Sequence, residues 1–430
     1  MIPTTDIVAK GTPAGWRTMP FWSLFRRQKS TGFPDEELLS VYRDYGVVPK
    51  SSRDDNHNKA SEDLSGYQLV TEGALVTNKM KAWQGSIAIS RYRGIVSPAY
   101  YVYTPQSNEC DQYLHYLLRS DPYIGLYGRI SKGVRVNQWD LEHEALRNIP
   151  VLLPDLATQR QIADFLDRET ARIDLLIEKK QRLVALLGEK KEAELSNLDQ
   201  ALFADTRKLS RLSYHVTKVG SGKTPSGGAT IYQETGVLFL RSQNIKNDGV
   251  SLEDAAYISD EINAGMANSR VQPRDILLNI TGASLGRCAI APADLPAANV
   301  NQHVCIIRPM KHLLPEYLHT LLIAPRMQGV IRAEAFSAGR EGLNFESIRN
   351  FRIPVPDTLE AQRAVASRIQ TISERDFRIL SANAKSIDRL KEYRSALITA
   401  AVTGQIDVQT YARSGTTDRH LDAIQEEMAP

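Results

Sequence analysis

The chain has 430 residues, of which 42% are hydrophobic and 24% are charged, and its formal net charge is +3. This length allows two to four domains, and the composition is that of globular proteins rather than of disordered or fibrous chains. The near-neutral charge excludes a protein that binds nucleic acid through an overall excess of Lys and Arg, so any such contact must be local.

The cysteines and the apolar segments bear on the cellular compartment. The chain has an odd number of cysteines, Cys110, Cys288 and Cys305, which favours a reducing compartment. Their spacing is not that of metal ligands, which argues against zinc. The first thirty residues lack the apolar core of a signal peptide, and no charge-free apolar run reaches the roughly 18 residues that span a bilayer. We therefore expect a cytoplasmic protein without a membrane partner.

Residues 1–150 alternate short apolar runs with Gly and Pro, which is typical of a mixed module of strands and helices. Strands are predicted over 69–76, 86–90 and 99–102, and a helix over 110–120. All four tryptophans of the chain lie in this module. Any second module must therefore fill its core differently.

Residues 151–205 are predicted to form a helical region. Pro154 and Asp155 form a favourable first turn. Apolar residues then follow alternating steps of four and three, the spacing of a coiled coil, with Glu169 and Lys180 at two of these positions. The alternative, a helix buried inside one domain, is disfavoured by its heavily charged outer face. The apolar positions are Ile162, Leu166, Ile173, Leu176, Leu183 and Leu187.

The second half repeats this organisation. A mixed module is predicted over 206–354, with strands over 236–240 and 275–280 and a helix over 315–323, and a second helical region over 355–411. Its coiled-coil positions are Val365, Ile369, Ile372, Ile379, Leu390 and Leu397, interrupted by Asp376, Asn383 and Ser386. We expect an α+β fold with two similar mixed modules separated by two long helices in an antiparallel coiled coil. The polar residues 412–430 are expected to be a poorly ordered tail.

The two halves share sequence motifs in the same order about 200 residues apart. Residues 113–118 (YLHYLL) reappear as 317–322 (YLHTLL), and Ile-Pro-Val at 149–151 reappears at 353–355. This period is too long for a solenoid repeat. It indicates a duplicated module with its helix, and hence two similar but unequal faces that suit a target with two unequal halves.

The motifs that suggest catalysis lack the neighbouring residues that the chemistry requires. Residues 220–224 (GSGKT) resemble a phosphate-binding loop, but Thr217 stands where the motif needs Gly, and Pro225 follows where its helix should begin. His115 and His319 repeat within their helices, which favours packing over catalysis. We find no glycine fingerprint for S-adenosylmethionine, no nuclease cluster and no nucleophile with a base, so we expect no catalytic residue, metal or cofactor in this chain.

Basic and amide side chains in loops are the candidate DNA contacts. Arg reads guanine, Asn and Gln read adenine, and Lys mostly binds phosphate. A solvated loop explains any single one of them equally well, but their recurrence in both modules favours DNA. The candidates are Lys79, Lys81, Arg91, Arg93, Arg129, Lys132 and Arg135 in the first module, and Lys223, Arg241, Gln243, Asn244, Lys246, Arg287 and Arg340 in the second.

Two stretches carry a family resemblance. Residues 149–190, from Ile-Pro-Val-Leu-Leu-Pro through Gln159-Arg160-Gln161-Ile162, resemble the central repeated region of the specificity subunits of type I restriction-modification systems, and residues 397–408 resemble their C-terminal ending. The family often has Glu before the repeated Gln, where this chain has Thr158 and Ala361. Residues 220–228 resemble the Gly-rich opening of a target-recognition domain, but residues 1–70 match no such opening.

The resemblance implies a non-catalytic adaptor. Two target-recognition domains, 1–150 and 206–354, would each read half of a bipartite asymmetric sequence in double-stranded DNA, and the helices would set the spacer. Two methyltransferase subunits and up to two restriction subunits would bring S-adenosylmethionine, ATP and magnesium. A helix of thirty to forty residues, about 50 Å long, matches roughly 15 base steps. The alternatives are a coiled-coil scaffold without sequence-specific DNA binding, or an enzyme that acts alone.

Overall fold

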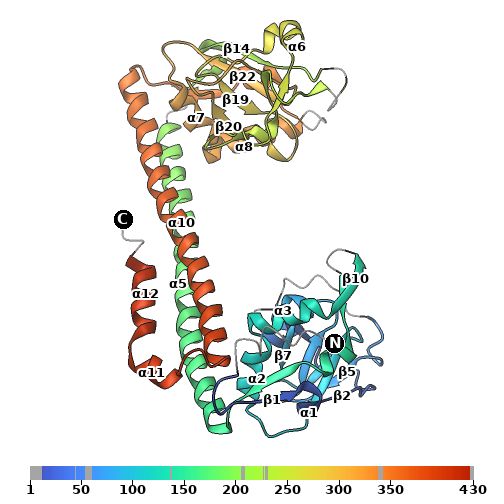
Figure 1. Ribbon diagram of the computed structural model, residues 1–430. Helices are drawn as coiled ribbons and strands as arrows, with labels where there is room; N and C mark the ends of the chain where they lie inside the picture. The colour runs from blue at the N-terminus through green and yellow to red at the C-terminus, as the bar shows by residue number, and fades with distance from the viewer. Residues whose placement is uncertain are drawn as a thin grey trace. The chain divides into compact units, whose positions relative to one another are not determined.

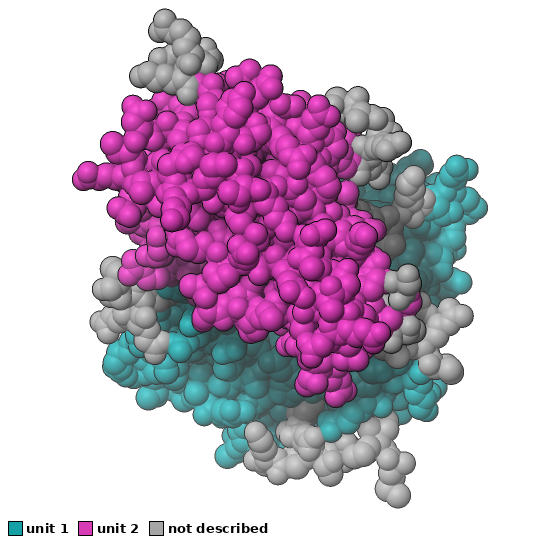
Figure 2. Space-filling view, turned by 90° about the horizontal axis from the view of Figure 1, so that it is seen from above, with its two compact units in different colours: residues 1–182, 382–430 teal, residues 183–381 magenta. Residues whose placement is uncertain are grey.

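The computed structural model describes residues 12–43, 45–53, 61–135, 138–204, 209–225, 227, 231–337 and 342–426. The chain divides into two compact units, which Figure 2 colours separately. Unit 1 comprises residues 1–182 and 382–430, and unit 2 comprises residues 183–381. Each unit therefore contains one mixed module, the first half of one long helix and the second half of the other.

The sheet of unit 1 has four antiparallel strands in the order β2 (Phe25–Gln28), β9 (Tyr100–Pro105), β6 (Leu75–Asn78) and β7 (Ile87–Ile89). Leu75 packs with the helices in one core cluster, whereas the next residue, Val76, packs in a second cluster on the other side. Successive side chains of a strand point to opposite faces. The sheet is therefore buried on both sides.

The remaining elements of this module surround the sheet (Figure 1). One expected strand, 69–76, is in fact two, because Gly73 at φ +80° turns the chain between β5 and β6. The other elements are β1 (Arg17–Pro20), α1 (Phe21–Leu24), β3 (Leu39–Tyr42), β4 (Gly46–Pro49), β5 (Gln68–Val70), β8 (Gly94–Val96), α2 (Asp111–Leu118), α3 (Asp121–Arg129), β10 (Ser131–Arg135), β11 (Gln138–Leu141), α4 (His143–Arg147) and β12 (Pro150–Leu153), which pairs with β1.

Unit 2 repeats this sheet. Its strands β14 (Val216–Ser221), β22 (Val304–Pro309), β19 (Ile276–Asn279) and β20 (Cys288–Ile290) follow the same order. A second sheet differs, because β15 (Val237–Leu240) pairs in parallel with β21 (Ala298–Val300) and antiparallel with β18 (Ala256–Ile258). The other elements are β13 (Leu209–Arg211), paired with β23 (Arg352–Pro354), and β16 (Ile245–Lys246), β17 (Gly249–Val250), α6 (Asp260–Gly265), α7 (Pro315–Ile323), α8 (Pro325–Ser337) and α9 (Phe345–Arg349).

The two long helices are α5 (Leu156–Leu202) and α10 (Leu359–Val402). In unit 1, Arg394 of α10 donates to both carboxylate oxygens of Asp174 of α5, at 2.8 and 3.0 Å. In unit 2, Nη2 of Arg375 lies 3.6 Å from Oε2 of Glu194. The residue number of the partner in α10 falls as the residue number in α5 rises, so the two helices pair antiparallel. The predicted fold class is confirmed.

The expected disordered tail is wrong for residues 412–426. The chain instead forms α11 (Val408–Arg413) and α12 (Thr416–Glu426), and Leu421 is almost fully buried in the core of unit 1. The tail is polar on average, but Leu421 and Ile424 lie three residues apart and so share one face of a helix. The average composition of the tail did not reveal that these two apolar residues share one face of a helix.

The repeated histidines hold helices to the edge of each sheet. Nε2 of His115 accepts from Nη1 of Arg119 at 2.7 Å, and burial first, then the Arg119 charge, lowers the pKa of His115 to about 3. His319 bonds the backbone oxygen of Cys288 at 3.0 Å, and burial lowers its pKa as well. Both residues pack, as their sequence context predicted.

The depressed pKa of His115 predicts acid sensitivity. An unfolded histidine is protonated below about pH 6.5, whereas the folded His115 is protonated only below about pH 3. The stability that the neutral His115 contributes is therefore present above about pH 6.5 and is lost as the pH falls. Between pH 7.5 and 5.5 we expect the free energy of unfolding to lose about 1.4 kcal/mol more in the native protein than in His115→Gln. Urea titrations at both pH values measure this; equal losses in the two proteins would contradict it.

Candidate nucleic-acid interface

The candidate residues of the first module lie at two different ends of its sheet. Lys79 and Lys81 follow β6, whereas Arg91 and Arg93 follow β7, and these neighbouring strands are antiparallel. The loops that follow antiparallel neighbours leave opposite ends of a sheet. The structure therefore does not bring the two pairs together. We call the end where β2 and β6 finish the cationic end.

Arg91 and Arg93 are held by side chains away from the cationic end. Nη2 of Arg91 donates to Gln112 of α2 at 2.7 Å, and Nε of Arg93 forms an ion pair with Glu36 at 2.8 Å. Both arginines are exposed. Arg93 already has an acidic partner, so less of its charge is available to a phosphate.

At the cationic end, two cations share one tyrosine ring. The guanidinium carbon of Arg27 lies 4.4 Å from the ring centroid of Tyr101, and Nζ of Lys79 lies 4.8 Å from it. Nζ of Lys79 also donates to the backbone oxygen of Pro98 at 2.8 Å. Burial, and then the Arg27 charge, lowers the pKa of Lys79. Like charges held this close are stabilised by an anion, which suits a phosphate group.

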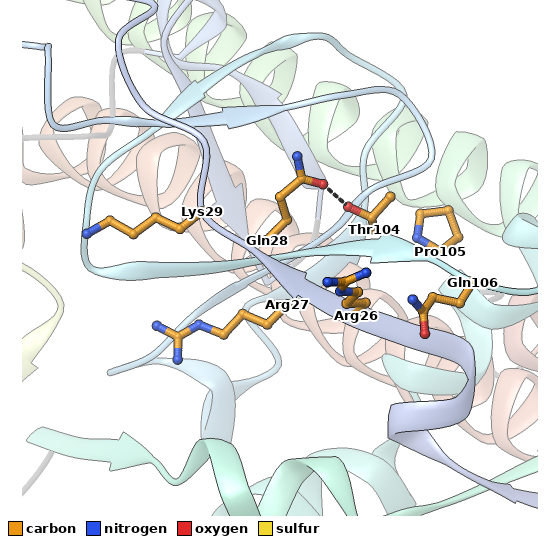
Figure 3. A pocket seen from close by; sticks show the side chains of 7 residues that line it. All are labelled: Arg26, Arg27, Gln28, Lys29, Thr104, Pro105 and Gln106. Carbon is orange, nitrogen blue, oxygen red and sulfur yellow. Dashed lines mark hydrogen bonds between the residues drawn. The ribbon is translucent and has the colours of Figure 1, made fainter.

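Arg27 belongs to a basic run on β2 that the sequence analysis missed. Arg26, Arg27, Gln28 and Lys29 line an open hollow of about 470 Å³ together with residues 104–106. Figure 3 shows Arg27 and Lys29 extending from the strand toward the same side. Because β2 occupies the place of β14, this segment is the equivalent of the Gly-rich opening. Its signal in the sequence was the basic run itself.

The hairpin β10–β11 adjoins the same end. The backbone N–H of Leu141 donates to the carbonyl of Lys79 at 2.9 Å, and the rings of Trp83 and Trp139 lie 4.9 Å apart. The hairpin brings further candidates to this place. Lys132 is exposed and pairs with Glu142 at 2.8 Å, Arg129 is exposed at the end of α3, Arg135 lies in β10, and Lys81 is exposed beside the hairpin.

The second module gathers its candidates at the equivalent end. Asn301 connects two strand ends, because its N–H donates to Leu240 at 3.1 Å and its carbonyl accepts from Gly222 at 3.2 Å. The side chain of Asn279, which ends β19, donates to the carbonyl of Ser242 at 2.8 Å. Loops after β14, β15 and β19 therefore meet. They carry Lys223, Gln243, Lys246 and Arg287, all exposed, and the half-buried Arg241.

Asn244 shapes a loop instead of contacting DNA. It is fully buried, donates to the carbonyls of Ser251 and Glu253 at 3.0 and 3.3 Å, and accepts from the N–H of Arg241 at 3.0 Å. Both hydrogens of its amide are used and the side chain is buried, so the predicted contact is corrected. Arg241 itself donates to the carbonyl of Asp254 at 2.7 Å. The last candidate, Arg340, lies outside the described residues.

Two glycines allow a test of how the Lys223 loop is held. A Cβ on Gly222 would lie 1.6 Å from the carbonyl oxygen of Val300, whereas a Cβ on Gly220 would meet nothing within 4 Å. We expect Gly222→Ala to lower the free energy of unfolding by about 1–3 kcal/mol, because the backbone must move apart. The control Gly220→Ala should change it by well under 1 kcal/mol. Thermal or urea unfolding of both variants measures the difference; equal effects would contradict this close approach.

The Gly-rich segment 220–224 differs in its structure from a phosphate-binding loop. Strand β14 ends at Ser221 and the described residues 222–225 are not helical, so residues 220–224 lack the helix of a phosphate-binding loop. Within the ranges that the structure describes, no three His, Cys, Asp or Glu side chains are grouped to hold a metal ion. In the same ranges, no helix is long and apolar enough to cross a membrane.

Comparison with curated proteins finds relatives of one kind. The chain is 27% identical over 180 residues to the EcoBI specificity subunit of a type I restriction enzyme from Escherichia coli, which covers 42% of this chain and 37% of that protein. It is 22% identical over 376 residues to the putative MjaX specificity subunit from Methanocaldococcus jannaschii, covering 81% and 82%. The first match thus spans little more than a third of that relative.

Solved structures share the fold. The HsdS subunit from Thermoanaerobacter tengcongensis is 17% identical with a TM-score of 0.52, covering 92% of this chain and 98% of that one. A chain from work on the complex assembly and conformational transition of the type I R-M system is 15% identical with a TM-score of 0.64, covering 92% and 99%. The model of the type I restriction modification DNA specificity domain matches residues 15–185 and 215–389. The chain therefore belongs to the family of the type I restriction modification DNA specificity domain, whose model it matches twice.

Proposed function

We propose that this chain is the non-catalytic specificity subunit of a type I restriction-modification complex. Each module reads one half of a bipartite, asymmetric target in double-stranded DNA, and the helix pair sets the spacer and docks two methyltransferase subunits. Up to two restriction subunits join the complex. S-adenosylmethionine, ATP and magnesium belong to those partners.

The observation that carries the proposal is the repeated cationic end. Both modules have the same strand order. In each sheet, the loop after the first strand of that order (β2 or β14) and the loop after the third (β6 or β19) meet at one end. The side chains there differ: Arg27, Lys29 and Lys79 in one module, Lys223 and Gln243 in the other. A shared frame positions both modules on phosphates, while different side chains read different bases. Two unequal half-sites follow.

The buried thiols support a non-catalytic role. Burial raises the pKa of Cys305 to about 12 and raises that of Cys288 further. A thiol that stays protonated is a poor nucleophile. These two cysteines therefore pack in the core and supply no covalent chemistry.

The helix lengths bound the spacer. Helix α5 has 47 residues and α10 has 44, more than the thirty to forty expected from the heptad pattern. At about 1.5 Å per residue this gives an upper limit of about 70 Å, or roughly 20 base steps. The first turns pack into the modules, where Gln159 and Gln362 are buried. The length available to the spacer is correspondingly shorter.

Mapping methylated adenines in the host genome, with and without this gene, tests the proposal. We expect one bipartite motif to lose its methylation when the gene is removed and to regain it when the gene is returned. The scaffold alternative predicts no motif that depends on this chain. Purified chain that methylated DNA or hydrolysed ATP without partners would contradict the non-catalytic role.

A pair of double variants tests which end of the first module contacts DNA. We expect Arg27→Ala with Lys29→Ala to weaken binding of the assembled complex about tenfold for each residue and to reduce the salt dependence by about one unit each, because both would neutralise phosphates. The matched control, Arg91→Ala with Arg93→Ala, removes the same charge at the opposite end. Fluorescence anisotropy over a salt series measures DNA binding by both variants. A larger loss of binding in the control would contradict an interface at the cationic end.

A further inference from the structure

Met80 is an exposed apolar residue at the cationic end of the first module. It lies between Lys79 and Lys81 just after β6, and 41% of its surface is exposed. Lys79 shares the ring of Tyr101 with Arg27, so Met80 stands among the groups that are proposed to bind phosphates. Phosphates are bound by charges and hydrogen-bond donors, and an apolar side chain supplies neither. The role of Met80 therefore concerns another part of the DNA.

The main chain around Met80 is occupied by hydrogen bonds within the module. The N–H of Met80 donates to Oδ1 of Asn78 at 3.0 Å, and its carbonyl accepts from Nε1 of Trp83 at 3.0 Å. The N–H groups of Lys79 and Lys81 donate to carbonyl oxygens at 3.1 and 3.2 Å. These three residues have no main-chain N–H left to offer a base. The loop holds its apolar side chain at the surface on a fixed backbone.

A matching triplet lies at the opposite end of the same sheet. Tyr92 stands between Arg91 and Arg93 after β7, and 41% of its surface is exposed as well. Its main chain is also held, because its N–H donates to Oγ of Ser90 at 3.1 Å. Both triplets place a large side chain between two cations. The one difference that matters here is the end of the sheet, so Tyr92 is a matched control for Met80.

The second module has a different side chain in the place of Met80. Asn78 and Asn279 end equivalent strands, so Met80 corresponds to Thr281. Thr281 is half-buried, and its hydroxyl forms a hydrogen bond with Nδ1 of His303 at 2.6 Å. Two unequal half-sites share the same phosphates and differ in their bases. A group that is present in only one module is therefore suited to reading a base.

The chemistry of the base edges limits what Met80 can read. In the major groove the bases present donors and acceptors, and the 5-methyl group of thymine is the one apolar group that identifies a base. Apolar side chains can also insert between base pairs as wedges. A wedge must project freely, whereas the module covers more than half of the surface of Met80. The exposed part suits a contact with a methyl group.

We propose that Met80 reads a thymine in the half-site of the first module, through contact between its side chain and the 5-methyl group of that base. The inference rests on the proposed function and adds one residue that selects a base. Arg27 and Lys79 hold the phosphate backbone at the same end, and Met80 faces the base edge. An apolar contact releases no counterions, so Met80 contributes to sequence preference and not to the salt dependence.

Replacement of thymine by deoxyuridine tests the inference, because it removes the 5-methyl group and keeps the base pair. The assembled complex is titrated by fluorescence anisotropy with duplexes in which each thymine of the two half-sites is replaced in turn. With the unmodified chain, one replacement should weaken binding about fourfold, as expected when one methyl-sized group loses its apolar partner. With Met80→Ala, binding to thymine DNA should already be about fourfold weaker, and the same replacement should have no further effect.

Two variants and a salt series control this experiment. Met80→Leu keeps an apolar side chain of similar volume and should retain the effect of deoxyuridine. Tyr92→Ala removes an equally exposed side chain at the other end and should leave every affinity within about 1.5-fold. The slope of log affinity against log salt should be the same for Met80→Ala and the unmodified chain, because no phosphate contact is lost.

Three results would overturn the inference and leave the proposed function intact. The first is deoxyuridine that weakens binding at no position, or equally in the unmodified chain and in Met80→Ala. The second is a Met80→Ala variant that loses affinity for all duplexes alike together with DNA bending, which would identify a wedge. The third is a first half-site without an A·T pair. A complex that binds no DNA sequence specifically would instead overturn the proposed function, and the inference with it.

Discussion

Exchanging residues 209–354 for the same region of a relative with another target should change one half of the recognised DNA sequence and leave the other half unchanged. Strands β13 and β23 pair at the two ends of this segment, with Leu209 opposite Pro354. The segment carries core clusters that share no residue with the cores of the first module. A module with its own core and closed ends can be replaced without disturbing the other.

The reciprocal exchange is the matched control for this prediction. Residues 17–153 are bounded in the same way by β1 and β12, with Arg17 opposite Leu153. Their replacement should change only the other half-site. Methylation mapping of cells that carry each chimaera, together with its methyltransferase subunit, measures both results. A chimaera in which both halves change would show that the modules do not read independently.

Lengthening both helices by seven residues should lengthen the permitted DNA spacer by about three base pairs. The pairs Asp174–Arg394 and Glu194–Arg375 place Gly188 of α5 opposite Leu380 of α10. Two turns inserted after each of these residues add about 10 Å and keep the heptad spacing. The half-site sequences should not change. Affinity for the best new spacer is expected to fall, because seven residues turn a helix about 20° short of two turns while three base pairs turn the DNA by roughly 100°.

Insertion in α5 alone is the control for the lengthened pair. On one side of the insertion, the coiled-coil positions of α5 are shifted against those of α10. The Asp174–Arg394 and Glu194–Arg375 pairs therefore cannot both form. This chain should lose stability and assemble poorly. Selection from a pool of targets with randomised spacers reads out the preferred length. An unchanged spacer in the doubly extended chain would contradict the role of the helix pair as a ruler.

The sequence by itself determined the repeat, the two long helices, the YLH helices and some of the strands, whereas strands such as β2, β14 and β22 were not predicted. The YLH helices, the strand of residues 276–279 and both long helices were predicted from periodicity and lie where expected. Local patterns determine such elements because burial repeats every second residue in a strand and every three to four in a helix. Asp376, Asn383 and Ser386, which the sequence showed as interruptions of the apolar coiled-coil pattern, are buried in the structure.

Only the tertiary structure decided which loops meet. The antiparallel pairing of β6 with β7 sends Lys79 and Arg91 to opposite ends of one sheet, and the pairing of β2 with β9 brings Arg27 to Lys79. Asn244 is buried by hydrogen bonds to residues seven and nine positions away, and α12 folds onto α5 through residues far apart in the chain. These contacts depend on strand order and helix docking between distant segments, and local periodicity carries no record of either.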